Sequence, residues 1–407
     1  MTRASTAGWR EPGRKGPPRK TLRPPQSLPV RRHPAAPGDG ATAFTLTLVN
    51  HTPPTASQDP DAVAAALLRD IGYLPGGLEV PPLGAGRRRG RPRLTAVQGP
   101  GACDPARPGA EVLDSTPYRL MVGCLLARPH HAFTIEELER ELGASRPTIY
   151  RHLNKLRDLE LLSHGDGGDD GGDATSGGTS RRRRYGLRFG SLGRAWRFTE
   201  LGAECALEGL RERVDLVWRE WEGRRHARAK EGRAGGDGAV RDMSQSHVSF
   251  RLVVRELGRP DPTAPAEAKM RDLMLAIGYL SEGRAPEADE GAGESVAWRL
   301  LQGCLVERCD RTWTVEQLMA RLDASKPTVY RHLRKLEGLD VLERTLVGGT
   351  PRSPKGMRLR FGDLSVAWNF TEEHAKSSLA AYRETVAHLE HLMEGRSRGG
   401  GAGEADR

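Results

Sequence analysis

The sequence predicts a mainly helical α+β protein in which one structural unit occurs twice. Residues 118–162 align with residues 298–342 without a gap, and 22 of the 45 positions are identical. In both copies, apolar residues recur at helical spacing and are followed by short segments with strand-like composition. The repeat extends upstream, since "IGYL" at Ile71 recurs at Ile277. These observations indicate an internal duplication.

A short strand and a helix are predicted ahead of each larger unit. "FTLTLV" at Phe44 corresponds to "FRLVVREL" at Phe250, and a helix ending at "IGYL" follows each strand. This strand-helix module carries no family resemblance. Downstream, "LRFGSLGRAWRFTE" at Leu187 corresponds to "LRFGDLSVAWNFTE" at Leu359. The first copy has the longer loops, so the second shows the elements of the larger unit more simply.

In the second copy, Thr314 precedes "VEQLMARL", whose apolar residues share one face, so a capped amphipathic helix is predicted. After the turn "DASK", Ser325 is placed as an N-cap and Pro327 in the first turn of a helix that runs through Leu339. "VLERTLV" is predicted as a strand. "MRLRFGDLSVAWNF" is predicted as one or two further strands, before a helix that starts at Thr371. Helix, helix, turn, helix and a β-ribbon make a winged helix.

The segment "TVEQLMARLDASKPTVYRHLRKLEGLDVLER" resembles the helix-turn-helix of MarR-, ArsR- and TrmB-type transcription regulators. "WNFTEEH" and "WRFTELG" resemble the strand end of the wings in those families, and the resemblance implies DNA binding. The families usually carry Gly after the recognition helix, where this chain has Glu160 and Asp340. Because Asp adopts left-handed backbone more readily than Glu, we expect a distorted turn in the first copy.

Composition completes the predicted division of the chain. Segments rich in Pro, Gly, Arg or mixed charge without periodicity are typical of disordered chain. We predict a disordered basic tail at 1–41, a strand-helix module at 42–75, a linker at 76–110, a winged helix with its C-terminal helix at 111–221, a charged linker at 222–246, a second module at 247–283, a second winged helix with its C-terminal helix at 284–395, and a disordered end at 396–407.

The two predicted recognition helices have outer faces suited to the major groove, which accepts a helix with small, polar or basic side chains. The first copy presents Arg146, Thr148, Tyr150, Arg151, Asn154 and Lys155. The second presents Lys326, Thr328, Tyr330, Arg331, Arg334 and Lys335. Arg suits guanine and Asn suits adenine, whereas the two late lysines suit phosphate. We interpret His152 and His332 as structural, packing on or bonding to the wing; a solvated helix surface is the alternative for the whole face.

Further basic segments point to DNA. "GRRRGRPRL" resembles an AT-hook that would place Arg89, Arg91 and Arg93 in a narrow minor groove, although chance is a rival in so Arg-rich a chain. The wings carry Arg181, Arg182, Arg183 and Arg184 in the first copy and Arg352, Lys355 and Arg358 in the second. We predict phosphate or minor-groove contacts for these residues, the alternative being a solvated strand edge. The acidic first wing tip, "GDGGDDGGDATSGG", weakens the case for a contact there and is interpreted as a flexible loop rather than a calcium site.

Each winged helix is followed by a helix with apolar residues spaced three and four apart. They are Leu207, Leu210, Val214, Val217 and Trp221 in the first copy and Leu379, Tyr382, Val386, Leu389 and Met393 in the second. This a/d pattern predicts a seam-forming helix. The seams can pair within the chain, giving a covalent pseudo-dimer, which is the favoured hypothesis. They can instead pair between chains, or each can cover the core of its own domain.

Charge and motifs narrow the function. The net charge of +10 suggests a polyanionic partner without choosing among DNA, RNA and membrane. Cys124 and Cys304 take equivalent apolar positions and are predicted in the core. No nucleotide-binding loop, nucleophile-base set or metal-ligand spacing is present in the sequence, so we predict no enzyme and no cofactor.

We expect a soluble transcription regulator that binds double-stranded DNA and no membrane, cytoplasmic or nucleoid-associated, or nuclear if eukaryotic. The alternatives are an architectural chromatin protein with low sequence selectivity and a winged-helix scaffold that binds proteins. The sequence shows no effector ligand, operator or direction of regulation.

Overall fold

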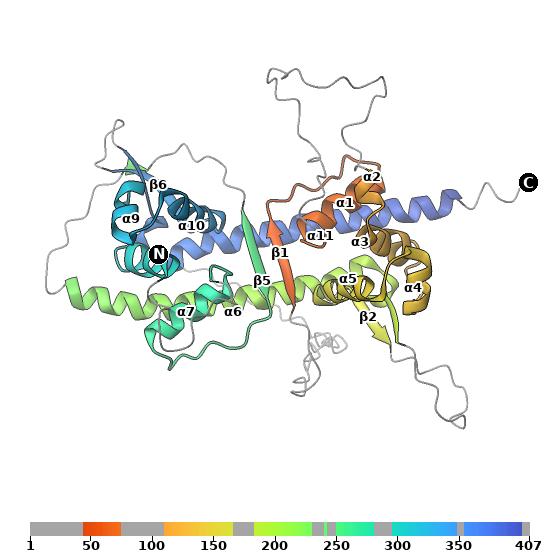
Figure 1. The fold of residues 1–407 in the computed structure, drawn as a ribbon, viewed down its shortest axis with the longest axis horizontal. Coiled ribbons are helices and arrows are strands. Elements are labelled where there is room, and N and C mark those ends of the chain that lie inside the picture. The colour runs from red at the N-terminus through yellow and green to blue at the C-terminus, as the bar shows by residue number, and fades with distance from the viewer. Residues whose placement is uncertain are drawn as a thin grey trace, which may run out of the picture. The chain divides into compact units, whose positions relative to one another are not determined.

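The computed structural model describes residues 44–74, 110–165, 183–229, 240–241, 250–280, 295–347 and 354–400 (Figure 1). Several sequence predictions fall outside these residues: the basic tail, the acidic tip of the first wing, and the AT-hook-like arginines Arg89, Arg91 and Arg93. The wing residues Arg181, Arg182 and Arg352 also lie outside them.

The first copy of the larger unit is a set of helices followed by a β-hairpin. Its helices are α2 (Ala110–Leu113), α3 (Thr116–Tyr118), the π-helical segment η1 (Arg119–Leu126), α4 (Ile135–Leu142) and α5 (Arg146–Asp158). Its strands β2 (Leu162–Gly165) and β3 (Arg184–Leu187) pair antiparallel. Phe133, just before α4, adds a bridge to Tyr185 of β3.

The second copy repeats this order. Its elements are α8 (Val296–Trp298), the π-helical η5 (Arg299–Val306), α9 (Val315–Leu322), α10 (Lys326–Gly338), and the antiparallel strands β6 (Leu342–Leu346) and β7 (Lys355–Leu359). Trp313 bridges to Met357 as Phe133 does to Tyr185. Cys124 and Cys304 are buried at their equivalent positions, as predicted.

Short-range hydrogen bonds cap the start of the first helix in each central helix pair, and a left-handed residue ends it. Thr134 and Glu137 form a reciprocal capping box at the start of α4, and Thr314 and Gln317 form the same box at α9. Both helices end on a residue in the left-handed conformation, Gly143 with φ 62° and Asp323 with φ 48°. The predicted cap at Thr314 is confirmed.

The expectation of a distorted turn after the first recognition helix was wrong. Glu160 and Asp340 both have φ 60°, so the two turns share one geometry. Each is held from outside the turn, because Arg188 pairs with the Glu160 carboxylate and Arg360 with that of Asp340. Thr199 also donates a hydrogen bond to the carbonyl of Leu159. These tertiary contacts override the weaker left-handed preference of Glu.

The segments predicted as the strand ends of the wings are helical instead. After β3 the chain turns at η2 (Arg188–Gly190), where Phe189 has φ 57°, and α6 (Leu192–Ala229) begins. The equivalent turn η6 (Arg360–Gly362) leads into α11 (Leu364–Gly400). Trp196, Thr199 and Ala203 are all buried. Their spacing of three and four residues is that of a helix rather than a strand, so "WRFTELG" and "WNFTEEH" lie inside the long helices.

The long helices also extend into a predicted charged linker and into the predicted disordered end. α6 continues to Ala229, into the charged stretch 222–246 expected to be a linker, and α11 reaches Gly400, inside the predicted end at 396–407. A two-residue strand from the same stretch, β4 (Val240–Arg241), pairs with β6. Charged residues without apolar periodicity are compatible with a helix that is solvated on all sides.

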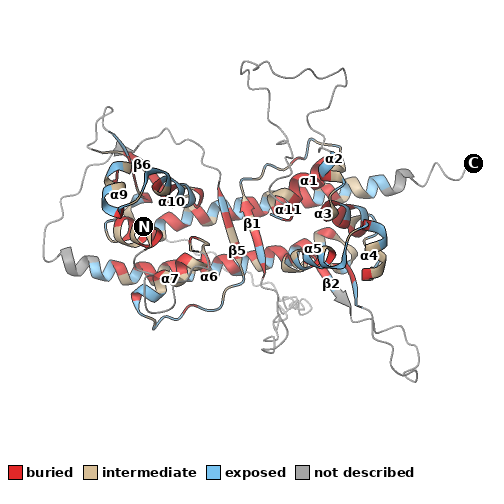
Figure 2. Ribbon diagram, viewed as in Figure 1, coloured by how far each residue is buried: buried red, intermediate tan, exposed pale blue. Residues whose placement is uncertain are grey.

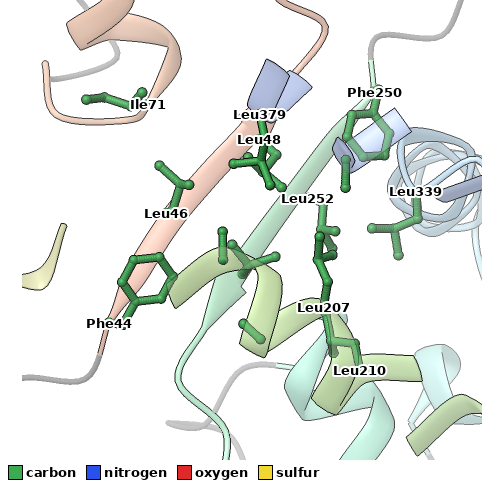
Figure 3. Close-up of a cluster of buried hydrophobic side chains, with 14 of the residues drawn as sticks. Phe44, Leu46, Leu48, Ile71, Leu207, Leu210, Phe250, Leu252, Leu339 and Leu379 are labelled. Atoms are coloured by element: carbon green, nitrogen blue, oxygen red, sulfur yellow. The ribbon is translucent and has the colours of Figure 1, made fainter. Parts of the chain in front are cut away.

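The strands of the two strand-helix modules pair with each other. β1 (Thr45–Val49) runs antiparallel to β5 (Arg251–Arg255), with Thr47 opposite Val253. Thr47 and Val253 are equivalent residues of the two copies, so the register is symmetric about this central pair. Side chains on one face of the ribbon are buried with residues of α6 and α11 (Figure 3), among them Leu46, Leu48, Leu252, Leu207 and Leu379.

α6 and α11 pack against one another antiparallel within the chain, and buried residues line both (Figure 2). Two equivalent ion pairs join them, Arg211 with Glu372 at 2.8 Å and Arg383 with Glu200 at 2.6 Å. Between these pairs lie Ala203 and Ala375, which have no exposed surface. Small residues at this crossing allow the two backbones to approach closely.

The module helices lie against the long helix of the other copy. α1 (Pro60–Asp70) contacts α11, and α7 (Ala266–Ala276) contacts α6. Each module also reaches the recognition helix of its own copy, since Tyr73 meets His152 edge-on with ring centroids 6.1 Å apart and Tyr279 meets His332 at 5.6 Å. The two histidines are thus structural, but they pack on the modules and not on the wings.

Overpacking the helix crossing should destabilise the whole core. We expect Ala203→Leu and Ala375→Leu each to lower the free energy of unfolding by about 1 to 3 kcal/mol, because the added atoms have no space. Ala380→Leu on the exposed face of α11 is the matched control. Urea denaturation followed by circular dichroism measures the difference, and equal stability of Ala203→Leu and the control would contradict the close crossing.

The buried histidine of α5 should make stability depend on pH. Burial, with smaller effects from Arg151 and Lys155, lowers the pKa of His152 from 6.5 to about 4. As the pH falls, the His152 imidazole is protonated in the unfolded chain before it is protonated in the folded one. The neutral, buried imidazole therefore stabilises the fold above pH 6.5, and this stabilisation is lost as the pH falls toward 4. We expect His152→Gln to flatten the unfolding free energy across this range. His391→Gln, at an exposed site, should leave the slope unchanged; a wild-type slope in His152→Gln would show that the histidine is solvated.

Candidate nucleic-acid interface

The outer faces of α5 and α10 carry the predicted DNA-contacting side chains. Tyr150 and Tyr330 are each 41% exposed, large fractions for aromatic side chains. Most of the other polar residues of the two outer faces are exposed as well, among them Arg151, Asn154 and Arg331. Thr148 and Thr328, in the first turn of each helix, are half-buried. All six predicted residues of each helix therefore reach the surface, as the periodicity required.

An apolar inner face fixes this presentation. The inner face of α5 is buried through Ile149, Leu153 and Leu156, and that of α10 through Val329, Leu333 and Leu336. Ser145 and Ser325 stand at the N-caps, and each hydroxyl lies about 3 Å from the hydroxyl of the threonine three residues on, at 3.1 and 2.9 Å. The predicted N-cap position of Ser325 is confirmed, although at these two described helix starts neither serine side chain bonds to the backbone.

Arg151 and Arg331 stand at equivalent exposed positions near the middle of the two helices. Neither guanidinium forms a hydrogen bond or an ion pair with any residue that the structure describes. A guanidinium carries five donors and stays charged at any physiological pH. These two side chains are therefore available for an external acceptor such as a guanine edge or a phosphate.

The start of the two helices differs in charge pairing. Arg146 is held by two carboxylates of α4, Glu139 at 2.9 Å and Glu136 at 3.5 Å. Lys326 is its equivalent in the second copy, where Met319 replaces Glu139. Within the described ranges Lys326 has no ion pair. A DNA contact by Arg146 therefore has to compete with α4, whereas Lys326 is free of that competition.

The two copies also differ beside the tyrosines. The ring of Tyr150 meets that of Tyr185 in β3 edge-on, with centroids 6.4 Å apart. Met357 occupies the position equivalent to Tyr185 in β7. Burial of the histidine behind each helix lowers the pKa of both His152 and His332, so neither adds positive charge to the face at neutral pH.

The described parts of the hairpins present fewer fully exposed cations than the sequence suggested. Arg183 and Arg184 are exposed at the start of β3, and Lys355 is exposed at the start of β7. Arg358 is instead half-buried and paired with the buried carboxylate of Glu343 at 2.7 Å. Its predicted contact with DNA stays a prediction, and such a contact would compete with this pair, because leaving Glu343 buried without its partner is costly.

Sequence reasoning missed these internal partners. Glu139 stands seven residues before Arg146, across a turn, and Glu343 reaches Arg358 only through strand pairing. The acidic residues were visible in the sequence, but their placement opposite a given arginine depends on the turn and the register. In the part of the chain that the structure describes, no helix is long and apolar enough to cross a bilayer.

Comparison with known families identifies two helix-turn-helix domains in the chain. The family described as "Bacterial regulatory protein, arsR family" matches residues 116–164, and the family described as "Helix-turn-helix domain" matches residues 297–345. No curated protein and no solved structure matches the chain. The matched ranges cover α3 to β2 and α8 to β6, with both recognition helices inside them. The chain therefore contains two helix-turn-helix domains of the kind that binds double-stranded DNA, consistent with a tandem regulator of the ArsR/MarR type.

Proposed function

We propose that the protein is a transcription regulator that reads one DNA site with two recognition helices, α5 and α10, each placed in the major groove. The observation that carries this proposal is the pair of exposed guanidiniums, Arg151 and Arg331, on two helices of matching geometry. A helix surface that only kept the protein soluble would not require the same basic residues at the same positions in both copies. Direct readout of bases needs side chains of this kind at this place.

The proposed architecture is a covalent pseudo-dimer of two winged-helix domains that arose by duplication. Its support is the near-twofold arrangement of the core. The equivalent residues Thr47 and Val253 pair at the centre of the ribbon, and equivalent ion pairs join α6 to α11. A homodimeric regulator presents two identical heads to a palindrome. Here one chain supplies both DNA-binding heads, by which we mean the helix-turn-helix domain of each copy with its hairpin.

The two heads are proposed to read different bases. Asn154 in α5 stands where α10 has Arg334. An asparagine bonds adenine through its N6 and N7 edge, while an arginine bonds guanine through O6 and N7. The preferred site is therefore two related but unequal half-sites. Lys155 and Lys335, one residue further on, are placed for phosphate.

The hairpins are proposed to hold the DNA backbone. Arg183 and Arg184 in the first hairpin and Lys355 in the second are the exposed cations that support this role. Phosphate contacts position a protein on the duplex and make its affinity depend on salt, but they carry no sequence information. Arg358 is assigned to the internal structure of its hairpin.

Removing the two equivalent arginines should weaken binding and relax selectivity. We expect Arg151→Ala/Arg331→Ala to lose on the order of 1 to 3 kcal/mol of binding free energy per arginine for the preferred duplex, and far less for random duplexes. Fluorescence anisotropy at two salt concentrations measures both. Arg219→Ala, an exposed arginine of α6, is the charge-matched control.

Each other result of that titration identifies an alternative. Binding that is uniform across duplexes, steep in salt and unaffected by the double substitution would support an architectural chromatin protein. Absence of binding at moderate salt would exclude both DNA-binding functions and favour a protein-interaction scaffold.

Making the heads alike should make the selected site more symmetric. We expect Asn154→Arg to give α5 the base preference of α10, so selection from a random duplex library should return an inverted repeat of the second half-site. Ser377→Arg adds the same charge on the exposed face of α11 and should keep the wild-type site. An unchanged, asymmetric site after Asn154→Arg would rule out base reading by this position.

A further inference from the structure

A cavity of about 360 Å³ lies between the first helix-turn-helix domain and α11, the long helix of the other copy. Its walls come from the end of η1, the turn after β3 and the last turns of α11. They are mainly apolar and include Leu126, Pro129, Leu187, Leu192, Leu389 and Met393. The size and the apolar lining are those of a site for a small organic molecule.

Two of the four polar side chains that line this cavity are acidic. Glu390 and Glu394 line it from α11, together with His130 and Ser191 from the first copy. The Ser191 hydroxyl donates a hydrogen bond to Glu390 at 2.8 Å. The imidazole of His130 covers Gly190, where a Cβ atom would collide with the ring. Two carboxylates at the edge of an apolar cavity favour a cation over an anion or a neutral molecule.

At the equivalent positions of the second copy the chain carries tryptophans. Glu390 and Met393 of α11 correspond to Trp218 and Trp221 of α6, and both of these indoles are buried. The facing residues differ in the same sense. Leu126 and Pro129 are half-buried, whereas their equivalents Val306 and Cys309 are buried.

The fold therefore accepts indole side chains at these two positions, whereas α11 carries the smaller Glu390 and Met393 there. Loss of two indoles would be destabilising if nothing took their place, since a cavity in a packed region forfeits its contacts. Replacing one of them by a carboxylate also changes the chemistry from apolar to anionic. This combination is hard to explain as a variant of core packing.

We propose that this cavity is a binding site for a small organic cation with an apolar body and an ammonium head. The body lies against Leu389 and Met393, and the head lies at Glu390 and Glu394. The site joins the first DNA-binding head to a helix that begins in the other copy, so an occupant contacts both halves of the molecule. The proposal concerns binding alone and does not depend on the proposed DNA-binding function.

The test uses three probes that share one apolar body, 4-phenylbutylamine, 4-phenylbutan-1-ol and 4-phenylbutyrate. Isothermal titration calorimetry on the full chain should show the amine binding about tenfold more tightly than the alcohol, roughly the effect of one charge-assisted contact. The carboxylate should bind most weakly. Glu390→Gln/Glu394→Gln should bring the amine and the alcohol to within about threefold of each other.

Two further variants make the result specific. Met393→Trp installs the residue of the second copy, and it should abolish binding of the amine and the alcohol together while the chain still melts like the wild type. Glu384→Gln, an exposed carboxylate elsewhere on α11, should change nothing. The proposal is overturned if the three probes bind the wild type equally, if the double Gln variant keeps the preference for the amine, or if Met393→Trp binds as the wild type does.

Discussion

The antiparallel packing of α6 on α11 is the contact on which the rest of the structure depends. Neither helix is covered by its own copy alone. Besides its contact with the other long helix, α6 packs against α7 of the second copy and α11 packs against α1 of the first copy. Each head is attached to the N-terminal end of one of these helices. Buried alanines at the crossing hold the backbones close, and the flanking ion pairs define the register. The two halves consequently share one apolar core.

Symmetry in the backbone coexists with different chemistry at equivalent side chains. In the first module His51 is buried between Asp70 at 2.8 Å and Thr385 of α11 at 2.7 Å. The residue equivalent to Thr385 is Arg213 of α6, which is buried and pairs with Asp272 at 2.9 Å. Both arrangements tie a module to the opposite long helix. Two repeats within one chain can differ in this way because each contact is made once, whereas in a homodimer every substitution acts twice.

The sequence predicted the repeats, the helix-turn-helix and the seam residues because each rests on periodicity, which a local pattern records. It mispredicted "WRFTELG" because family resemblance suggested a strand, while the buried series Trp196, Thr199 and Ala203 already had helical spacing. The partners of Arg146 and Arg358 were out of reach, because they depend on turn geometry and strand register. The cavity beside α11 could not be predicted either, since Trp221 and Met393 both satisfy an apolar seam position.

The proposed covalent pseudo-dimer also has consequences for the thermodynamics of recognition. A homodimeric regulator must associate before or while it binds, so its apparent affinity depends on its own concentration. When both heads belong to one chain, binding of the first places the second near its half-site at a high effective concentration. Each head can then be weak, and the pair remains selective because a mismatch in either half-site weakens the whole complex. The shared core makes this gain possible, since heads on a flexible tether would lose the fixed half-site spacing that a rigid pair imposes.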